Sequence, residues 1–116
     1  MQNFPLLSVG KDPLLLSTRN EVLRAAGFDV ISCSSVKEAL LAMSSGPLCA
    51  VVLCHSVPPG ERDQIRAMLS RLQPTVSAMV VCCGDYDARY DELLVENDPR
   101  VLVSTVTASA KAIGLH

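Results

Sequence analysis

The chain has 116 residues, which is one domain's worth and enough to form a core without metal or disulfide staples. Hydrophobic residues make up 49% of it but aromatic residues only 3%, so the core must be aliphatic, and no apolar segment approaches the ~20 residues that span a bilayer. The net charge of −2 comes from scattered acids and bases, and there is no basic run or signal peptide, so we expect a cytoplasmic protein that binds neither nucleic acid nor membrane.

The first half of the chain alternates short apolar runs with stretches of helical period. Asp12 followed by Pro13 is typical of a helix start, because an aspartate N-cap accepts backbone N–H groups and proline fits the first helical position. Gly27 is typical of a helix end, and Ser34 or Ser35 of a second helix start. Strands are therefore predicted at residues 6–9 and 28–33, and helices at residues 12–26 and 35–44.

The second half of the chain continues the alternation. Leu48–Cys54 is the most continuous apolar run and is predicted to be the central strand. The Pro58-Pro59-Gly60 sequence predicts a turn after it. The remaining predictions are a helix at residues 61–72, a strand at 78–83, a weak helix at 88–96, a turn at 97–99, a strand at Val101–Val103 and a short last helix from Thr107 to about Ile113.

This order of elements predicts the fold class. Strands that alternate with helices form β-α units, and right-handed crossovers between them favour a parallel sheet. We therefore predict an α/β fold, a three-layer α-β-α sandwich around a five-stranded parallel sheet, in a single domain over residues 1–116. The chain ends soon after the last predicted helix starts, so we expect a stand-alone domain with no attached output domain.

The order of the units, their spacing and the Pro58-Pro59-Gly60 turn together resemble the receiver domains of response regulators, the CheY-like family, over essentially the whole chain. The segment from Leu14 to Cys33 is also typical of that family, since Ala-Ala-Gly-Phe stands there between a leucine-rich helix and an apolar strand. The resemblance implies a flavodoxin-like strand order of 2-1-3-4-5. It also implies a functional crevice at the carboxyl ends of strands one, three, four and five.

The residues that give receivers their chemistry are not found at the corresponding positions. The resemblance implies adjacent acids after the first strand, an acceptor aspartate ending the third, Thr or Ser after the fourth and Lys-Pro after the fifth. A thiol cannot form an acyl phosphate, and magnesium requires hard oxygen ligands. We therefore predict a degenerate phosphorylation pocket with no metal, no cofactor and no enzymatic activity. The residues assigned to it are Gly10, Lys11, Asp12, Cys54, Cys82 and Ser104.

Lys11 and Cys54 each have more than one interpretation. Lys11 either supplies a positive charge in place of the metal or points into solvent, as lysines usually do. Cys54 is either a buried structural thiol or a redox thiol that pairs with Cys82 or Cys83, and a zinc site that includes His55 is a further alternative. A carboxylate introduced at Cys54 is expected to be buried near few hydrogen-bond donors, unless Lys11 reaches it.

The acidic stretch after the fourth strand is a candidate partner face. Tyr86, Tyr90 and Asp91 place aromatic side chains beside charge, which suits an interface, although a solvated helix face is equally compatible. The leading hypothesis is a non-catalytic receiver-like signalling module of two-component or phosphorelay type that acts by protein–protein contact. The partner would be a signalling protein or a second copy of the chain. The alternative is a thiol redox sensor, and no motif supports an enzyme acting on a small ligand.

Overall fold

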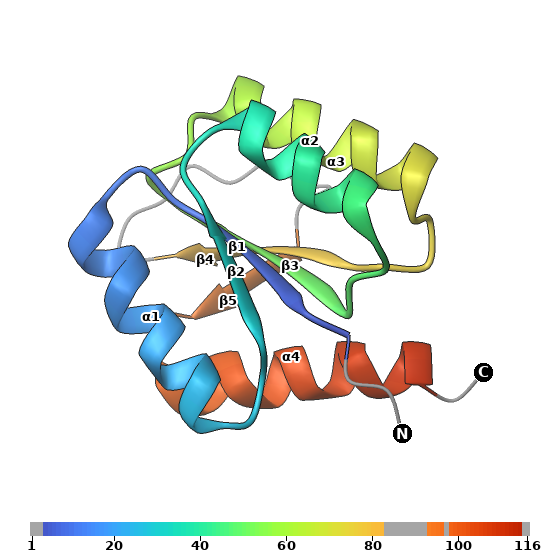
Figure 1. The fold of residues 1–116 in the computed structure, drawn as a ribbon. Coiled ribbons are helices and arrows are strands. Elements are labelled where there is room, and N and C mark those ends of the chain that lie inside the picture. Colours follow the sequence, from blue (N-terminus) through green and yellow to red (C-terminus); the bar gives the residue numbers. More distant parts are fainter. Residues whose placement is uncertain (1–3, 83–92, 97, 115–116) are drawn as a thin grey trace.

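A computed structural model describes residues 4–82, 93–96 and 98–114, with residues 82, 93–96 and 112–114 described by their backbone alone. Its parallel sheet has the strand order β2-β1-β3-β4-β5 (Figure 1). In the described ranges, no helix is long and apolar enough to cross a membrane. The elements in chain order are β1 (Leu6–Val9), α1 (Pro13–Ala25), β2 (Val30–Cys33), α2 (Val36–Ser45), β3 (Ala50–Cys54), α3 (Pro59–Leu72), β4 (Ala78–Cys82), β5 (Leu93–Glu96) and α4 (Pro99–Gly114).

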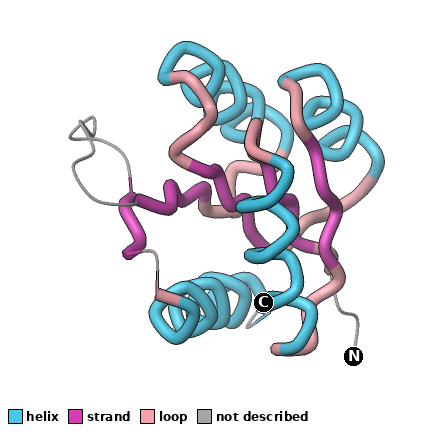
Figure 2. The backbone as a smooth tube through the Cα atoms, turned by 90° about the vertical axis from the view of Figure 1, so that its left-hand side faces the viewer, coloured by secondary structure: helices cyan, strands magenta, loops and turns pink. Residues whose placement is uncertain are grey.

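The helices cover the two faces of the sheet in pairs (Figures 1 and 2). α2 and α3 lie on one face, whereas α1 and α4 lie on the other. Every residue of β3 is buried, because this strand lies inside the sheet and has helices over both of its faces. Two aliphatic clusters form the core, one on each face of the sheet. The cluster on the α2–α3 side includes Leu7, Val51, Leu53, Ile65 and Val80. The cluster on the α1–α4 side includes Leu6, Leu23, Val52, Leu102 and Val106.

The predicted helix starts in the first half of the chain are confirmed. Asp12 is the N-cap of α1, and its side chain accepts hydrogen bonds from two backbone N–H groups of the first turn. Ser35 caps α2 by accepting from the backbone N–H of Glu38, whose own carboxylate accepts from the Ser35 hydroxyl. Gly27 follows α1 with a φ of 99°, a conformation that favours glycine.

The parallel α/β fold and the strand order β2-β1-β3-β4 are confirmed, but three predictions near the C-terminus are wrong. Val101–Val103 is not a strand, because it lies inside α4. The strand beside β4 is instead Leu93–Glu96, which overlaps the helix predicted at residues 88–96; residues 88–92 of that helix lie outside the described residues. The last helix therefore begins at Pro99 rather than at Thr107.

The cap at Asp98 is the physical reason for this difference. Its Oδ1 accepts a hydrogen bond from the Arg100 N–H over 2.9 Å, and its carbonyl accepts from the Leu102 N–H over 2.9 Å. Pro99 occupies the first helical position, where a missing N–H costs nothing. The apolar residues that follow therefore continue as a helix, which buries Leu102 and Val106 against the sheet.

The Asp98 cap leads to a stability prediction. Asp98→Ala should lower the free energy of unfolding by about 1 kcal/mol, because the first turn of α4 loses a side-chain acceptor. Asp98→Asn should lose much less, since asparagine caps helices about as well as aspartate. Urea unfolding would measure both, with Asp12→Ala as a matched control at the start of α1. An Asp98→Ala protein as stable as the parent would contradict the cap.

Candidate functional site

The carboxyl ends of β1 and β3 lie side by side at one edge of the sheet. Val9 pairs with Leu53 in the register, so the next residues along, Gly10 and Cys54, face each other. A Cβ atom at Gly10 would lie 3.1 Å from the Cys54 Cβ and 3.3 Å from the Leu16 Cδ1. Because contacts this short force the neighbours to move, an acidic side chain does not fit at Gly10 without a local shift.

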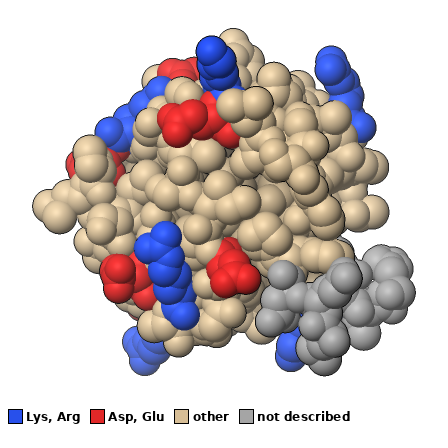
Figure 3. Space-filling model, in the orientation of Figure 1, with Lys and Arg blue, Asp and Glu red and all other residues tan. Residues whose placement is uncertain are grey.

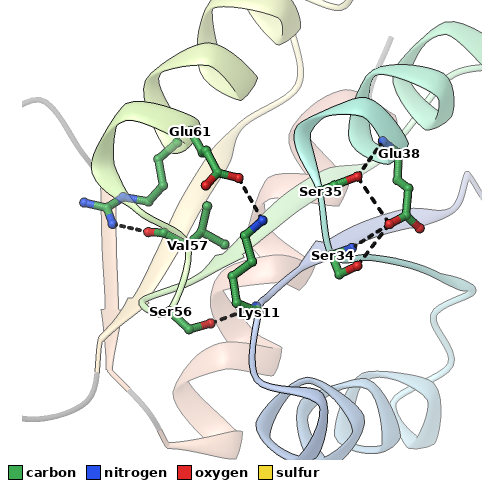
Figure 4. Close-up of polar contacts among 8 residues, drawn as sticks. Lys11, Ser34, Ser35, Glu38, Ser56, Val57 and Glu61 are labelled. Carbon is green, nitrogen blue, oxygen red and sulfur yellow. Dashed lines mark hydrogen bonds and ion pairs between the residues drawn. The ribbon is translucent and has the colours of Figure 1, made fainter.

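Lys11 connects the loop after β1 to the loop and helix that follow β3 (Figure 4). Its backbone N–H donates to the Ser56 Oγ over 3.0 Å, and its Nζ lies 2.9 Å from the Glu61 Oε1 at the start of α3. Both charged side chains are about one-third exposed, at 37% and 31%. The charge of Lys11 is therefore paired with a carboxylate of α3 and does not point freely into solvent, while its role as a substitute for a metal charge stays a prediction.

The charge of Lys11 also extends to Glu38 at the start of α2. Hydrogen bonds from the Ser34 side chain, then from its backbone N–H, hold the pKa of Glu38 below its usual value, and the Lys11 charge contributes a smaller effect in the same direction. Figure 4 shows these two groups of contacts next to each other. Both the lysine and the nearby serines thus stabilise carboxylates of this chain.

Asp12, the one acid of the Gly10-Lys11-Asp12 run, is used in capping. Its Oδ1 accepts from the Leu14 N–H over 3.0 Å and from the Leu15 N–H over 3.2 Å. Within residues 4–82, 93–96 and 98–114, no group of three or more His, Cys, Asp or Glu residues could hold a metal ion.

The acceptor position is occupied by a buried pair of residues. Cys54 is 2% exposed, and its Sγ accepts a hydrogen bond over 2.7 Å from NH1 of Arg19, a residue of α1 that is itself only 6% exposed. The His55 Nδ1 lies 3.9 Å from the same sulfur. The sequence analysis did not identify Arg19 as a site residue. The signal that could have identified it was an arginine at helical spacing from the apolar residues Leu16 and Leu23.

The predicted role of the other cysteines stays a prediction. Cys54 pairs with Val81 in the β3–β4 register, so Cys82 lies one position further along the neighbouring strand. The side chain of Cys82 and the whole of Cys83 lie outside the described residues. The three described cysteines that are free are Cys33, Cys49 and Cys54, all buried.

Ser104 was wrongly placed in the pocket. It lies in α4, where its Oγ donates to the Val101 carbonyl over 3.2 Å, because Val101–Val103 is helix and not strand. The residues that follow β5 after position 97 are Asp98 and Pro99. They stand where the resemblance implies Lys-Pro, so an acid replaces the expected base.

The candidate partner face and the surface charge are the remaining features. Tyr86, Tyr90 and Asp91 lie outside the described residues, so their role in binding a partner stays a prediction.

On the face shown in Figure 3, acidic and basic side chains of the described residues are interspersed, with no continuous basic surface. That face has no electrostatic footprint of the kind that binds a phosphate backbone.

Several solved structures with a similar fold are receiver domains. A CheY-like receiver domain protein from Methanospirillum hungatei JF-1 has a TM-score of 0.81 and 15% identity, covering 99% of this chain and 100% of that chain. The signal receiver domain of an HD domain-containing protein from Pseudomonas fluorescens Pf-5 has a TM-score of 0.83 and 13% identity, covering 99% and 100%. The receiver domain of a sensor histidine kinase from Pseudomonas aeruginosa PAO1, with magnesium coordinated in its active-site cleft, has a TM-score of 0.80 and 10% identity, covering 95% and 99%.

No protein-family model and no curated protein sequence matches the chain. Identities of 10–15% support a conclusion about the fold alone. The chain therefore has the fold of the CheY-like receiver domains.

The Arg19–Cys54 contact changes what is expected of Cys54→Asp. The buried carboxylate would find a guanidinium donor in Arg19, contrary to the expectation of few donors. The substitution should therefore cost less than about 1 kcal/mol of unfolding free energy when Arg19 is present. In an Arg19→Met background it should cost roughly 3 kcal/mol, because the buried charge is then unpaired. A double-mutant cycle by urea unfolding measures the difference, and equal costs in the two backgrounds would rule out the pairing.

Proposed function

We propose that this domain is a receiver-like signalling module of two-component or phosphorelay type that does not accept phosphate on an aspartate and acts by protein–protein contact. The observation that carries the proposal is Cys54, a thiol at the acceptor position, with its sulfur hydrogen-bonded to the buried Arg19. A thiol in this place cannot form the acyl phosphate that switches a receiver. The receiver fold gives the coarse class of the module.

The rest of the crevice also supports a module without phosphotransfer. Gly10 offers no side-chain ligand for a cation, and a carboxylate side chain there would require Cys54 and Leu16 to shift. Lys11 brings a positive charge to the place of a metal ligand, and Glu61 already pairs with it. After β5 the chain has Asp98 where the resemblance to receivers implies a lysine, and its carboxylate caps α4. We therefore propose a non-enzymatic domain without a cofactor, placed in the cytoplasm with other signalling domains of this fold.

Incubation with acetyl phosphate or with a phosphorylated histidine kinase, in the presence of magnesium, should leave the mass of the protein unchanged. The reason is the absence of an acceptor carboxylate and of its magnesium ligands. Intact-mass spectrometry makes the measurement, with a receiver domain of known acceptor activity treated in parallel. An adduct of one phosphoryl group per chain that survives acid but not base would overturn the proposal, because that stability identifies an acyl phosphate on a carboxylate.

Magnesium should not stabilise the fold. A ligand at about 100 times its dissociation constant adds about 2.7 kcal/mol when it binds only the folded state. In a domain of this size, that energy corresponds to a rise in Tm of roughly 10 °C. We expect no such rise for this chain in millimolar magnesium, and a clear one for the Pseudomonas aeruginosa domain as positive control. A comparable rise in Tm in both proteins would contradict the proposal that the positions of Gly10 and Lys11 supply no magnesium ligands.

The proposed partner is another signalling protein or a second copy of this chain. Sedimentation velocity over a range of concentrations tests the second copy directly, and affinity capture followed by mass spectrometry tests the first. Because the proposed signal does not depend on phosphate, binding to a captured partner should be unchanged by acetyl phosphate. Binding that appears only after acetyl phosphate treatment would contradict this mode of action.

A further inference from the structure

We propose that Cys54 is a site of reversible oxidation by a hydroperoxide, and that Arg19 binds the oxygen atom that oxidation adds to the sulfur. The proposal concerns the chemistry at the end of β3, and it does not require the domain to act by protein contact. It rests on the group that Arg19, Cys54 and His55 form, and it needs no second cysteine.

The described cysteines differ in their surroundings although all of them are buried. Cys33 and Cys49 are 5% and 6% exposed, and burial is the main cause that raises the pKa of each thiol. Such thiols are poor nucleophiles, because the reactive species is the thiolate. Cys54 is even less exposed, at 2%, but among the described cysteines it is distinguished by a sulfur that accepts a hydrogen bond from a guanidinium and has an imidazole beside it. Local charge, rather than exposure, thus distinguishes Cys54.

Arg19 is suited to hold an oxidised sulfur. Its guanidinium is buried and permanently charged, and NH1 already points at the Cys54 Sγ from 2.7 Å. A sulfenic acid places an oxygen next to the sulfur, and such an oxygen is a stronger hydrogen-bond acceptor than the sulfur itself. A hydrogen bond to a charged donor in a buried site is among the stronger ones in proteins. The oxidised state is therefore stabilised by a group that is already in place.

The oxidation step balances with His55 as proton carrier. The thiol proton of Cys54 passes to the His55 Nδ1, which lies 3.9 Å from the sulfur. The sulfur attacks the peroxide oxygen, an S–O bond forms and the O–O bond breaks. The leaving alkoxide or hydroxide takes up the proton that His55 carries, so that a thiol and a hydroperoxide give a sulfenic acid and an alcohol or water. Sulfur loses two electrons and the peroxide gains them. A small thiol reductant reverses the change through a mixed disulfide, with release of water.

Access to the sulfur is controlled by Lys11. Its contacts with Ser56 and Glu61 connect the loop after β1 to the loop after β3 and to the first turn of α3, and both loops adjoin the strand ends at Gly10 and Cys54. An ion pair between side chains that are one-third exposed is weak, so these loops can separate at small cost. A peroxide as small as hydrogen peroxide can then reach Cys54 without unfolding of the sheet.

The test measures sulfenic acid formation at each cysteine of the folded protein. Hydrogen peroxide is added with a cyclic dione that traps sulfenic acids, and peptide mass spectrometry follows the adduct at Cys33, Cys49 and Cys54 over time. The adduct at Cys54 should form about tenfold faster than at the other two, because a charge-assisted hydrogen bond is worth at least a factor of that size. In denaturant the three rates should be alike. An adduct at Cys54 that forms no faster than at Cys33 and Cys49 overturns the proposal.

Three variants separate the role of Arg19 from access. Arg19→Met keeps an apolar stem but removes the guanidinium, so the preference for Cys54 should disappear, whereas Arg19→Lys should retain part of it. Lys11→Met should raise the rate at Cys54 while leaving the rates at Cys33 and Cys49 unchanged. If Arg19→Met raises all three rates, that variant has loosened the fold, and the comparison of Arg19→Lys with the parent decides instead.

Two results with these variants would contradict the proposal. One is a preference for Cys54 that is unchanged in both Arg19 variants. The other is a disulfide from Cys54 to Cys82 or Cys83 in place of the dione adduct. That product would mean that a second thiol, and not Arg19, stabilises the oxidised sulfur.

Discussion

Arg19 lies on the sheet-facing side of α1, and a guanidinium in that position has to be satisfied by acceptors inside the protein. The cost of moving a charged group out of water is several kcal/mol, so the groups around it determine whether α1 can pack on the sheet at all. The Cys54 sulfur at the end of β3 is one of those acceptors. The acceptor position of the receiver fold is thereby linked to the packing of the first helix.

The sequence predicted most of the fold because its strongest signals are local. Asp12-Pro13 identified the start of α1, since capping involves residues that are close in the chain. The same dipeptide at Asp98-Pro99 was interpreted as a turn, because the β-branched residues at 101 and 103 favour a strand. In the structure the cap prevails over β propensity, and the helix buries Leu102 and Val106. If Asp98-Pro99 had been interpreted as a helix start, as Asp12-Pro13 was, the sequence would have predicted α4.

The site was only partly predictable, for a related reason. Gly10 and Cys54 could be placed together from the sequence, because the ends of neighbouring parallel strands meet at one edge of a sheet. The partners of these residues come from positions far along the chain: Arg19 is 35 residues from Cys54, and Ser56 is 45 residues from Lys11. Charge pairing over such separations depends on helix rotation and side-chain reach, which periodicity alone does not fix.

The core and the crevice are largely separate in this fold. Neither aliphatic cluster includes Gly10, Lys11 or Cys54, so most of the hydrophobic packing that holds the sheet and helices together is made by other residues. The charged groups described around the crevice have partners within the chain. Lys11 pairs with Glu61, Arg19 donates to Cys54, and Asp98 caps α4. In the Pseudomonas aeruginosa receiver domain, by contrast, the cleft holds a magnesium ion. The internal pairing of the described charges is consistent with the proposed module, and it leaves the thiol of Cys54 as the group at which a different input would act.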